Sequence, residues 1–343
     1  MIGVRRRVLV DEGALPYIPM DGHDERGDVR AEMAMLPAPF RADRLSLRDV
    51  ARLRWDLGTT VSVCLPARDE EATIGSIVGS IRRDLIETEG LVDEVIVLDD
   101  GSGDRTAERA ALAGARVERV DSILPELPPG AGKGDVLWKS LFVSRGDLIC
   151  WVDADIRNFR SHLVWRLLAP LLTDPPVELV KGYFRRPADG SPHGGGRVTE
   201  LVARPLIAKL FPHLAGIIQP LAGATAGRRR ALESIPFVEG WGVEFAMLVD
   251  VVRRSGLGAV AQVDLGSVEH DRRSLTKLVP QAMAILTVAL RRAGLEQPVD
   301  PICELLRFDE DHEGTMESVP VAERPPMRDV AAYATCLAAE LPA

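Results

Sequence analysis

The chain has 343 residues, of which 46% are hydrophobic and 27% charged, and its formal net charge is −9. This composition is typical of a globular protein with a sizeable core, and the acidic balance argues against a general nucleic-acid-binding protein. No apolar run approaches the roughly 18 residues that span a bilayer. Residues 1–11 also lack the apolar centre of a signal peptide, so we expect a cytoplasmic protein without a membrane partner.

The two ends of the chain differ from its middle. Residues 1–58 include a charged, turn-rich segment, although residues 45–57 have the pattern of a short amphipathic helix. We interpret residues 1–58 as a partly disordered N-terminal extension. Residues 295–343 contain several prolines and a helical run at 330–341, and we interpret them as a loosely attached C-terminal tail. The main domain is therefore expected over residues 59–294.

Between these ends, strand patterns alternate with helix patterns. Strands are predicted at residues 59–65, 92–98, 115–120, 148–152, 177–184 and 259–265, and helices at residues 73–85, 106–113, 135–143, 163–172, 198–211 and 275–293. Continuous apolar and β-branched runs such as 59–65 (TTVSVCL) are typical of buried parallel strands. Repeated strand-loop-helix units predict an α/β fold with a Rossmann-like, mostly parallel sheet and helices on both faces. Ligands bind at the carboxyl edge of such sheets.

The most informative strand is the run at residues 148–155 (LICWVDAD), which ends in two carboxylates one residue apart. Because alternate residues of an extended chain point to the same side, Asp153 and Asp155 can face one hard cation, and that cation can bridge a diphosphate. The alternative is that Asp-Ala-Asp merely ends a strand and begins a turn. The neighbouring loops favour the cation site.

Two glycine-containing loops precede predicted helices. Residues 128–134 (PPGAGKG) contain Lys133 and resemble a phosphate-binding loop in composition, but they lack the spacing of a P-loop NTPase. In residues 189–197 (DGSPHGGGR) and the helix start that follows, backbone amides with Arg197 and Thr199 would form an anion site. The alternatives are a solvated surface loop for Lys133 and a simple hinge for the second loop.

Five motifs occur in order along the chain: PARDEE at 66–71, DDGS at 99–102, GKG at 132–134, DAD at 153–155 and GGGRVTEL at 194–201. Together they resemble the GT-A glycosyltransferases. More narrowly, they resemble the actinobacterial glucosyl-3-phosphoglycerate synthase family, which also includes mannosyl-3-phosphoglycerate synthases. The resemblance covers residues 59–294, and the last motif is the most specific. It implies a GT-A fold with a nucleotide-binding half at 59–157 and an acceptor-binding half at 158–294.

The resemblance also implies donor and metal sites. The nucleotide sugar would contact Pro66, Ala67, Arg68, Glu70, Asp100, Lys133, Asp153, Ala154 and Leu221. Asp153, Asp155 and His270 would hold Mg²⁺ or Mn²⁺ against the diphosphate, where the cation neutralises the charge of the leaving group. By itself His270 would be an ordinary surface or core histidine, but like the diacid it follows the end of a predicted strand.

The acceptor that the resemblance implies is 3-phosphoglycerate. The acceptor-binding residues would be Gly196, Arg197, Thr199 and Arg272. Arginine suits this role because its guanidinium can grip an oxyanion through two hydrogen bonds. Asp155, Arg197 and Glu244 would be the catalytic residues, with Glu244 near the sugar, although a glutamate on a helix surface is the alternative for Glu244.

The family retains the anomeric configuration of the sugar. Two suitably spaced carboxylates would suggest a covalent glycosyl-enzyme route by analogy with glycosidases, but no dedicated nucleophile is evident here. We therefore expect a front-face substitution in which the leaving phosphate accepts the proton of the acceptor hydroxyl.

Other functions stay open from the sequence. Residues 222–226 (AGATA) and Trp241 depart from the family pattern near the sugar, so GDP-mannose is the alternative donor to UDP-glucose. A nucleotide-sugar-binding protein without catalysis would be expected to have a damaged metal or acceptor site, and transfer to a lipid phosphate is disfavoured because no membrane segment is found. The helices at 198–211 and 275–293 would supply the face of a homodimer.

Overall fold

The computed structural model of the chain describes residues 39–40, 42–186, 196–270, 274–296, 300–308 and 312–340, without the side chains of residues 43 and 336–340. The described residues all belong to one compact unit, Leu36–Ala343. The disorder predicted for the N-terminal extension falls mostly on residues outside them.

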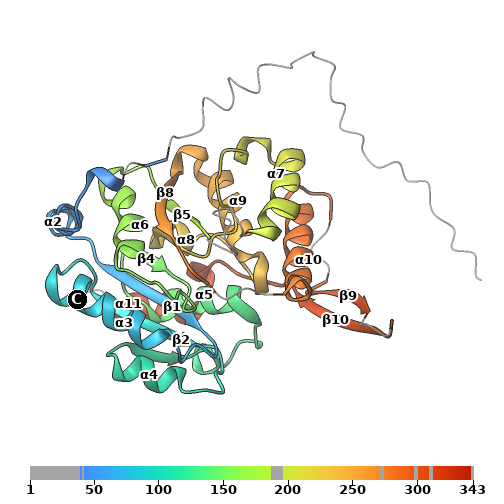
Figure 1. Cartoon of the computed structure of the whole chain (residues 1–343), viewed down its shortest axis with the longest axis horizontal. Helices are drawn as coiled ribbons and strands as arrows, with labels where there is room; N and C mark the ends of the chain where they lie inside the picture. The colour runs from blue at the N-terminus through green and yellow to red at the C-terminus, as the bar shows by residue number, and fades with distance from the viewer. Residues whose placement is uncertain are drawn as a thin grey trace, which may run out of the picture. The chain divides into compact units, whose positions relative to one another are not determined.

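In the part of the chain that the structure describes, a seven-stranded sheet forms the centre (Figure 1). Its strands are β1 (Val61–Ala67), β2 (Glu94–Asp99), β3 (Arg116–Arg119), β4 (Leu148–Trp151), β5 (Leu179–Arg185), β6 (Thr225–Arg228) and β8 (Val260–Ser267). They lie in the order β3-β2-β1-β4-β6-β5-β8. Strand β6 is antiparallel to both neighbours and the other pairs are parallel, so the predicted mostly parallel sheet is confirmed.

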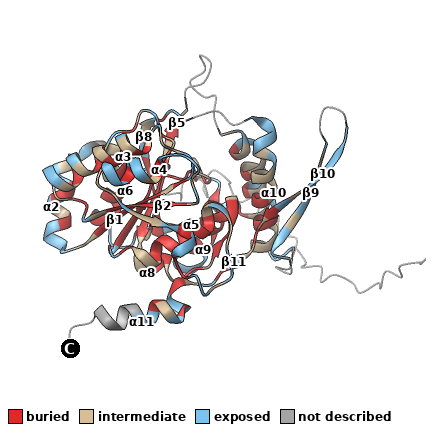
Figure 2. Cartoon of the chain, turned by 90° about the horizontal axis from the view of Figure 1, so that it is seen from below, coloured by how far each residue is buried: buried red, intermediate tan, exposed pale blue. Residues whose placement is uncertain are grey.

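Helices pack on both faces of the sheet. They are α2 (Leu47–Leu57), α3 (Ile74–Ile81), α4 (Thr106–Leu112), α5 (Gly132–Val143), α6 (His162–Thr173), α7 (Arg204–Leu210), α8 (Arg229–Leu232), α9 (Val243–Ser255), α10 (Leu275–Arg292) and α11 (Ala331–Glu340). Within β1, Val63 and Leu65 share a core with α3 and α6, whereas Cys64 shares a core with α5 and α9. This division follows from the two-residue period of a strand that is buried on both faces, and Figure 2 shows the strands as the buried centre.

The amphipathic helix predicted near the N-terminus is present as α2. The Ser46 side chain accepts a hydrogen bond from the Asp49 backbone N–H, and the Asp49 side chain accepts one from the Ser46 N–H, which caps the helix. The buried Arg54 side chain forms an ion pair with Asp93, and Asp93 also accepts a 2.7 Å hydrogen bond from the Val61 N–H. These contacts tie α2 to the first strand.

Strand β6 and the segment at 198–211 differ from the sequence prediction. The sequence does not predict β6, because its four residues (TAGR) carry no strand pattern and the strand forms by pairing with β4 and β5. The long helix expected at 198–211 is divided into a π-helical segment, η4 (Thr199–Ala203), and α7. Pro205 explains the division, because proline has no N–H with which to continue the α-helical bonding pattern.

The C-terminal segment packs against the domain. Strands β9 (Ile302–Phe308) and β10 (Gly314–Pro320) form an antiparallel hairpin beside α10, and β11 (Glu323–Arg324) pairs with β7 (Phe237–Val238). Met327 and Tyr333 are buried in the same core as α5 and α9, so the expectation of a loosely attached tail is wrong for this part of the segment. The domain boundaries themselves stay predictions. Among the described helices, none combines the length and the apolar character needed to cross a membrane.

Candidate active site

The carboxyl ends of β1, β4, β5 and β8 surround a cavity of about 980 Å³. The predicted site residues that line it are Pro66, Ala67, Arg68, Glu70, Asp100, Lys133, Asp153, Ala154, Asp155, Gly196, Arg197, Thr199, Leu221, Glu244 and His270. Arg272 lies outside the described residues. Segments up to about 200 residues apart meet here because parallel strands bring their carboxyl ends to the same edge of the sheet.

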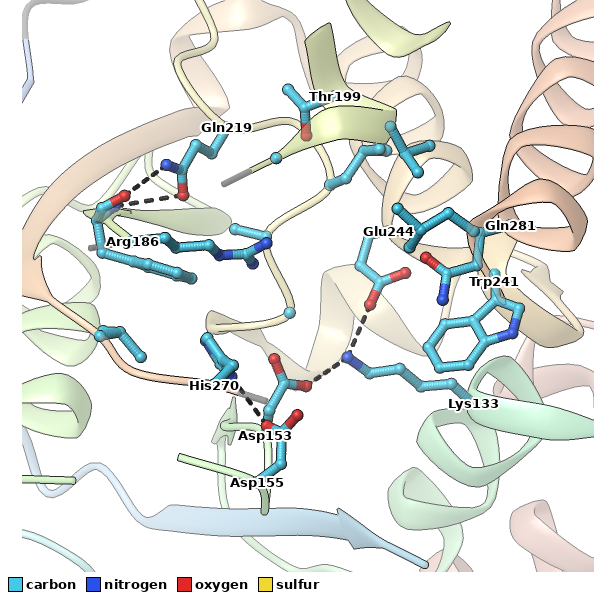
Figure 3. Close-up of a pocket in the computed structure, with 18 of the residues that line it drawn as sticks. Lys133, Asp153, Asp155, Arg186, Thr199, Gln219, Trp241, Glu244, His270 and Gln281 are labelled. Carbon is cyan, nitrogen blue, oxygen red and sulfur yellow. Dashed lines mark hydrogen bonds and ion pairs between the residues drawn. The ribbon is translucent and has the colours of Figure 1, made fainter. Parts of the chain in front are cut away.

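Lys133 lies in the first turn of α5 and bridges two carboxylates (Figure 3). Its Nζ is 2.6 Å from Asp153 Oδ1 and 2.8 Å from Glu244 Oε1. Burial raises the pKa of Asp153, but the Lys133 ammonium outweighs burial and brings this pKa down to about 2. Gly223 leaves space for the pair, because an added Cβ would lie 2.5 Å from Lys133 Nζ and from the Asp153 oxygens. Lys133 therefore lines the cavity and is not a solvated surface lysine, and its contact with the nucleotide stays a prediction.

Asp155 and His270 form the second polar pair of the cavity. Asp155 Oδ1 is 3.0 Å from His270 Nδ1, and the His270 ring lies against Phe184 with 5.7 Å between ring centroids. The other ring nitrogen, Nε2, is buried and has no hydrogen-bond partner among the described residues. Buried polar atoms normally have partners. The orphaned nitrogen therefore fits a ligand position for a metal ion, whose histidine ligands commonly donate their other N–H to a carboxylate.

Within the described ranges, no group of three His, Cys, Asp or Glu side chains lies close enough to hold an ion. Asp153 is paired with Lys133. Mg²⁺ in nucleotide sites is commonly held by one or two carboxylates together with substrate phosphates and water. Asp155 and His270 fit such a site, which the donor diphosphate would complete, and the predicted set with Asp153 stays a prediction.

The nucleotide end of the cavity is built from the loops after β1 and β2. The Asp100 N–H donates to Ala67 O at 2.9 Å, and the Asp100 carboxylate lies 3.7 Å from the Arg68 guanidinium. Burial raises the pKa of Asp100, and Arg68 partly offsets that effect. Thr73 Oγ1 donates to Ala154 O at 2.6 Å, which joins the loop after β1 to the diacid loop.

The cavity is also rich in arginine. Besides Arg68, its lining includes Arg185, Arg186, Arg197 and Arg204. Gly196 has a φ of +80°, a conformation that suits glycine, and it precedes Arg197 and the buried Thr199. Guanidinium groups in a cavity are suited to a small, doubly anionic ligand.

Sequence reasoning missed Arg186 and Gln219. The Arg186 guanidinium lies 4.9 Å from the Phe184 ring centroid, and its side chain extends into the cavity between Gln219 and His270 (Figure 3). Gln219 donates to Phe184 O at 2.6 Å and accepts from the Phe184 N–H at 3.3 Å. Arg186 follows the end of a predicted strand, and this position could have indicated that it lines the cavity. No sequence pattern indicates that Gln219 does so.

The geometry of this cavity can now be compared with known proteins. The chain matches the model of Glycosyl transferase family 2 over residues 62–234. It is 47% identical over 274 residues to the glucosyl-3-phosphoglycerate synthase of Mycolicibacterium smegmatis, an alignment that covers 79% of this chain and 89% of the relative. The chain belongs to the glucosyl-3-phosphoglycerate synthase family.

Solved structures of this family have the same fold. The glucosyl-3-phosphoglycerate synthase of Mycobacterium tuberculosis, in complex with Mn²⁺, UDP-glucose and phosphoglyceric acid, is 41% identical with a TM-score of 0.74, and the match covers 83% of this chain and 95% of the other. The mannosyl-3-phosphoglycerate synthase of Rubrobacter xylanophilus is 36% identical with a TM-score of 0.78, covering 85% and 96%. The predicted GT-A glycosyltransferase fold is therefore confirmed. The roles of individual residues stay predictions.

Proposed function

We propose that this protein is a metal-dependent retaining glycosyltransferase that moves glucose from UDP-glucose to the hydroxyl of 3-phosphoglycerate, giving glucosyl-3-phosphoglycerate. The observation that carries the proposal is one cavity whose lining combines the Asp155–His270 pair with Arg197 and Thr199. The relative with UDP-glucose and phosphoglyceric acid bound has the same fold. A non-catalytic nucleotide-sugar-binding protein would not need both of these groups of residues.

The donor would bind across the carboxyl ends of β1 and β4. Asp155 and His270 would hold Mg²⁺ or Mn²⁺, which supplies Lewis-acid stabilisation of the departing diphosphate. Arg68 and Asp100 would contact the nucleoside, and Lys133 would turn from Asp153 toward a donor phosphate when the nucleotide arrives. Lys133 lies between two carboxylates, which fix the position of its ammonium in the cavity. The ammonium would there stabilise the negative charge that develops on the departing diphosphate.

The acceptor would bind beside the arginines that line the cavity. Arg197 and Arg186 would pair with its phosphate and carboxylate, and Thr199 would donate a hydrogen bond. Glu244 would lie beside the sugar, but it is paired with Lys133 at 2.8 Å, which lowers its nucleophilicity. A front-face substitution is therefore the favoured route, and detection of a glycosyl adduct on Glu244 would overturn it.

GDP-mannose is the second candidate donor. The fold similarity to the Rubrobacter xylanophilus mannosyl-3-phosphoglycerate synthase is as high as that to the glucosyl enzyme. Discrimination between glucose and mannose depends on the placement of one or two polar groups around a single hydroxyl. The choice between the donors is therefore an experimental question.

The first experiment incubates the full chain with 3-phosphoglycerate and Mg²⁺ or Mn²⁺, and offers UDP-glucose and GDP-mannose separately and then in competition. We expect glucosyl-3-phosphoglycerate, identified by mass spectrometry, with UDP-glucose preferred. A preference for GDP-mannose would select the second candidate. Absence of product from either donor would contradict the acceptor assignment.

The metal site is tested with Asp155→Asn. We expect kcat to fall by at least about 100-fold, because the variant loses a charged ligand of the ion. Removal of divalent ions with EDTA should abolish turnover of the unaltered protein, and added Mn²⁺ should restore it. Asp121→Asn is the matched control, since Asp121 is exposed and pairs only with the exposed Arg119 among its described contacts. Unchanged activity in Asp155→Asn would reject this site.

A homodimer in the cytoplasm completes the proposal. The hairpin of β9 and β10 exposes the apolar side chains of Leu306, Phe308 and Met316. Apolar side chains gathered on one exposed face of a hairpin favour a protein partner, and a second copy of the chain is the simplest one. Both substrates are multiply charged and do not cross membranes unaided, which supports an enzyme that shares their compartment.

A further inference from the structure

An arginine from the C-terminal segment is buried beneath the site. Arg324 lies on β11, outside residues 62–234 that the family model matches, and it is only 7% exposed. Its Nε is 2.7 Å from Asp135 Oδ1 and 3.1 Å from Glu239 Oε1, and its Nη2 donates to Pro128 O at 2.9 Å. One guanidinium therefore joins the loop before α5, α5 itself and the turn after β7.

Both carboxylates belong to segments that carry site residues. Asp135 follows Lys133 by two residues in the first turn of α5. Glu239 immediately precedes η6 (Gly240–Gly242), which leads into the first turn of α9, where Glu244 lies. In the cavity, Lys133 Nζ is 2.8 Å from Glu244 Oε1. The first turn of α5 and the segment that leads into α9 are therefore joined twice, by the Lys133–Glu244 pair in the cavity and by the ion pairs of Arg324 with Asp135 and Glu239 outside it.

Neighbouring contacts hold the guanidinium in place. The Glu239 N–H donates to Ala322 O at 2.8 Å, which continues the pairing of β11 with β7. The indole N–H of Trp138 donates to Pro325 O at 2.8 Å, and the Arg324 guanidinium lies 5.4 Å from the Trp138 ring centroid. Gly130 packs against the ion pair so closely that an added Cβ would lie 2.1 Å from Arg324 Nη2.

The positive charge of Arg324 stabilises two buried carboxylates, Asp135 and Glu239. Asp135 is 2% exposed and Glu239 is 8% exposed, so neither carboxylate is well solvated. Lys139, 3.2 Å from Asp135, is the second cation of the cluster. Without Arg324, Asp135 would keep Lys139, but Glu239 would lose its ion-pair partner among the described residues. A buried carboxylate without a partner moves toward water or takes up a proton.

We propose that Arg324 is a positioning residue that sets the position of Lys133 relative to Glu244. Through Arg324, the C-terminal segment contributes to catalysis. Arg324 does not line the cavity, so it acts through Asp135 and Glu239. The catalytic readout rests on the proposed glucosyl transfer. A binding readout does not, because it uses only nucleotide and Mn²⁺.

The test compares Arg324→Met with Arg54→Met. Both arginines are 7% exposed and ion-paired. Arg54 lies on α2 and pairs with Asp93, and neither of these two residues lines the cavity. We expect both variants to lower the melting temperature. Only Arg324→Met should lower kcat, by at least tenfold, while the KM for 3-phosphoglycerate changes less than threefold. Calorimetry with UDP and Mn²⁺ should show at least fivefold weaker binding in Arg324→Met and less than twofold change in Arg54→Met.

Further variants keep the proposal testable if Arg324→Met does not fold. Glu239→Gln retains the Arg324–Asp135 pair and removes only the charged link to the turn, so it should lower kcat by a smaller factor without loss of folding. Arg324→Lys should restore part of the activity. The proposal is overturned if folded Arg324→Met or Glu239→Gln keeps both kcat and UDP affinity within twofold. If the unaltered protein makes no product but Arg324→Met still weakens UDP binding, the proposed function fails and the positioning role stands.

Discussion

Lys181 is a lysine whose ammonium is enclosed by protein beside Ala222, a residue that lines the cavity. It is 2% exposed, and its Nζ donates to Ala222 O at 2.6 Å and to Thr225 Oγ1 at 3.1 Å. Burial is the main cause that lowers its pKa from 10.5 to about 8, although Glu244 acts in the opposite direction. Lys181 thus holds the loop that contains Ala222 and Gly223, at the expense of desolvating a charge.

This lysine predicts a specific pH dependence of stability. Below pH 8 the ammonium is charged in both states, and burial of the charge lowers the free energy of unfolding. Between pH 8 and 10.5 the folded state releases its proton while the unfolded state keeps it, so the unfolded state binds more protons and stability rises with pH. The full change is roughly 3 kcal/mol, because one pKa unit corresponds to about 1.36 kcal/mol. Urea unfolding of the unaltered protein and Lys181→Met should show a stability difference that shifts in favour of lysine across this range; a difference that stays constant would contradict the lowered pKa.

At the scale of elements, the position of α5 decides where Lys133 lies. Its first turn packs directly on the backbone after β7, because Gly134 has no side chain. An added Cβ would lie 1.8 Å from Val238 O and 3.0 Å from Glu239 Cα, and neither atom can rotate away. Gly132, with a φ of +68°, begins the helix in a conformation that suits glycine. The two glycines of the GKG motif therefore serve close approach of backbones as well as any contact with phosphate.

Gly134→Ala should displace α5. We expect a loss of about 1–3 kcal/mol in stability from overpacking, and a fall in kcat of at least tenfold because Lys133 moves away from Asp153 and Glu244. Gly79→Ala in α3 is the matched control, since no atom lies within 4 Å of its added Cβ. The control should gain up to about 1 kcal/mol from helix propensity and keep its kcat. Equal kinetics in the two variants would show that this contact does not position Lys133.

At the scale of the whole molecule, the C-terminal hairpin has one covered and one open face. Cys303 and Leu305 are half-buried, and they and the buried Val319 pack with α10. The apolar side chains on the open face include Leu306, Phe308 and Met316, which are 52–65% exposed. Figure 2 shows this face of the hairpin as exposed. Leu306 and Met316 are directly opposite in the register and Phe308 follows Leu306 on the same face, so these three side chains form an apolar strip, which Glu304 separates from Ile302.

The homodimer is tested on this strip. Light scattering after size exclusion should give about twice the 37.3 kDa of the chain. Leu306→Glu combined with Met316→Glu should shift the mass toward the monomer, because a carboxylate is strongly disfavoured in an apolar interface. Leu112→Glu is the control, since Leu112 is 80% exposed on α4, far from the hairpin in sequence. A monomeric unaltered protein, or a double variant that stays dimeric, would reject the strip as the dimer interface.

Local patterns in the sequence predict part of the fold and part of the candidate site. The strands before Asp100 and Asp153 were readable because continuous apolar runs end abruptly in polar residues, and parallel topology then placed those ends together. The motif around Arg197 carries the family resemblance, which implies the roles of Lys133 and His270, and His270 also follows the end of a predicted strand. Each of these signals is contained in a few consecutive residues.

Only the tertiary structure decided the contacts that join distant segments. The four residues of β6 form a strand because β4 and β5 supply its hydrogen bonds. Arg324 reaches Asp135 across 189 residues, and a sequence pattern cannot reveal which buried carboxylates an arginine will pair with. The physical reason is that local patterns encode the backbone conformation of each segment, whereas the pairing of charges and the fit of glycines depend on which surfaces the completed fold brings into contact.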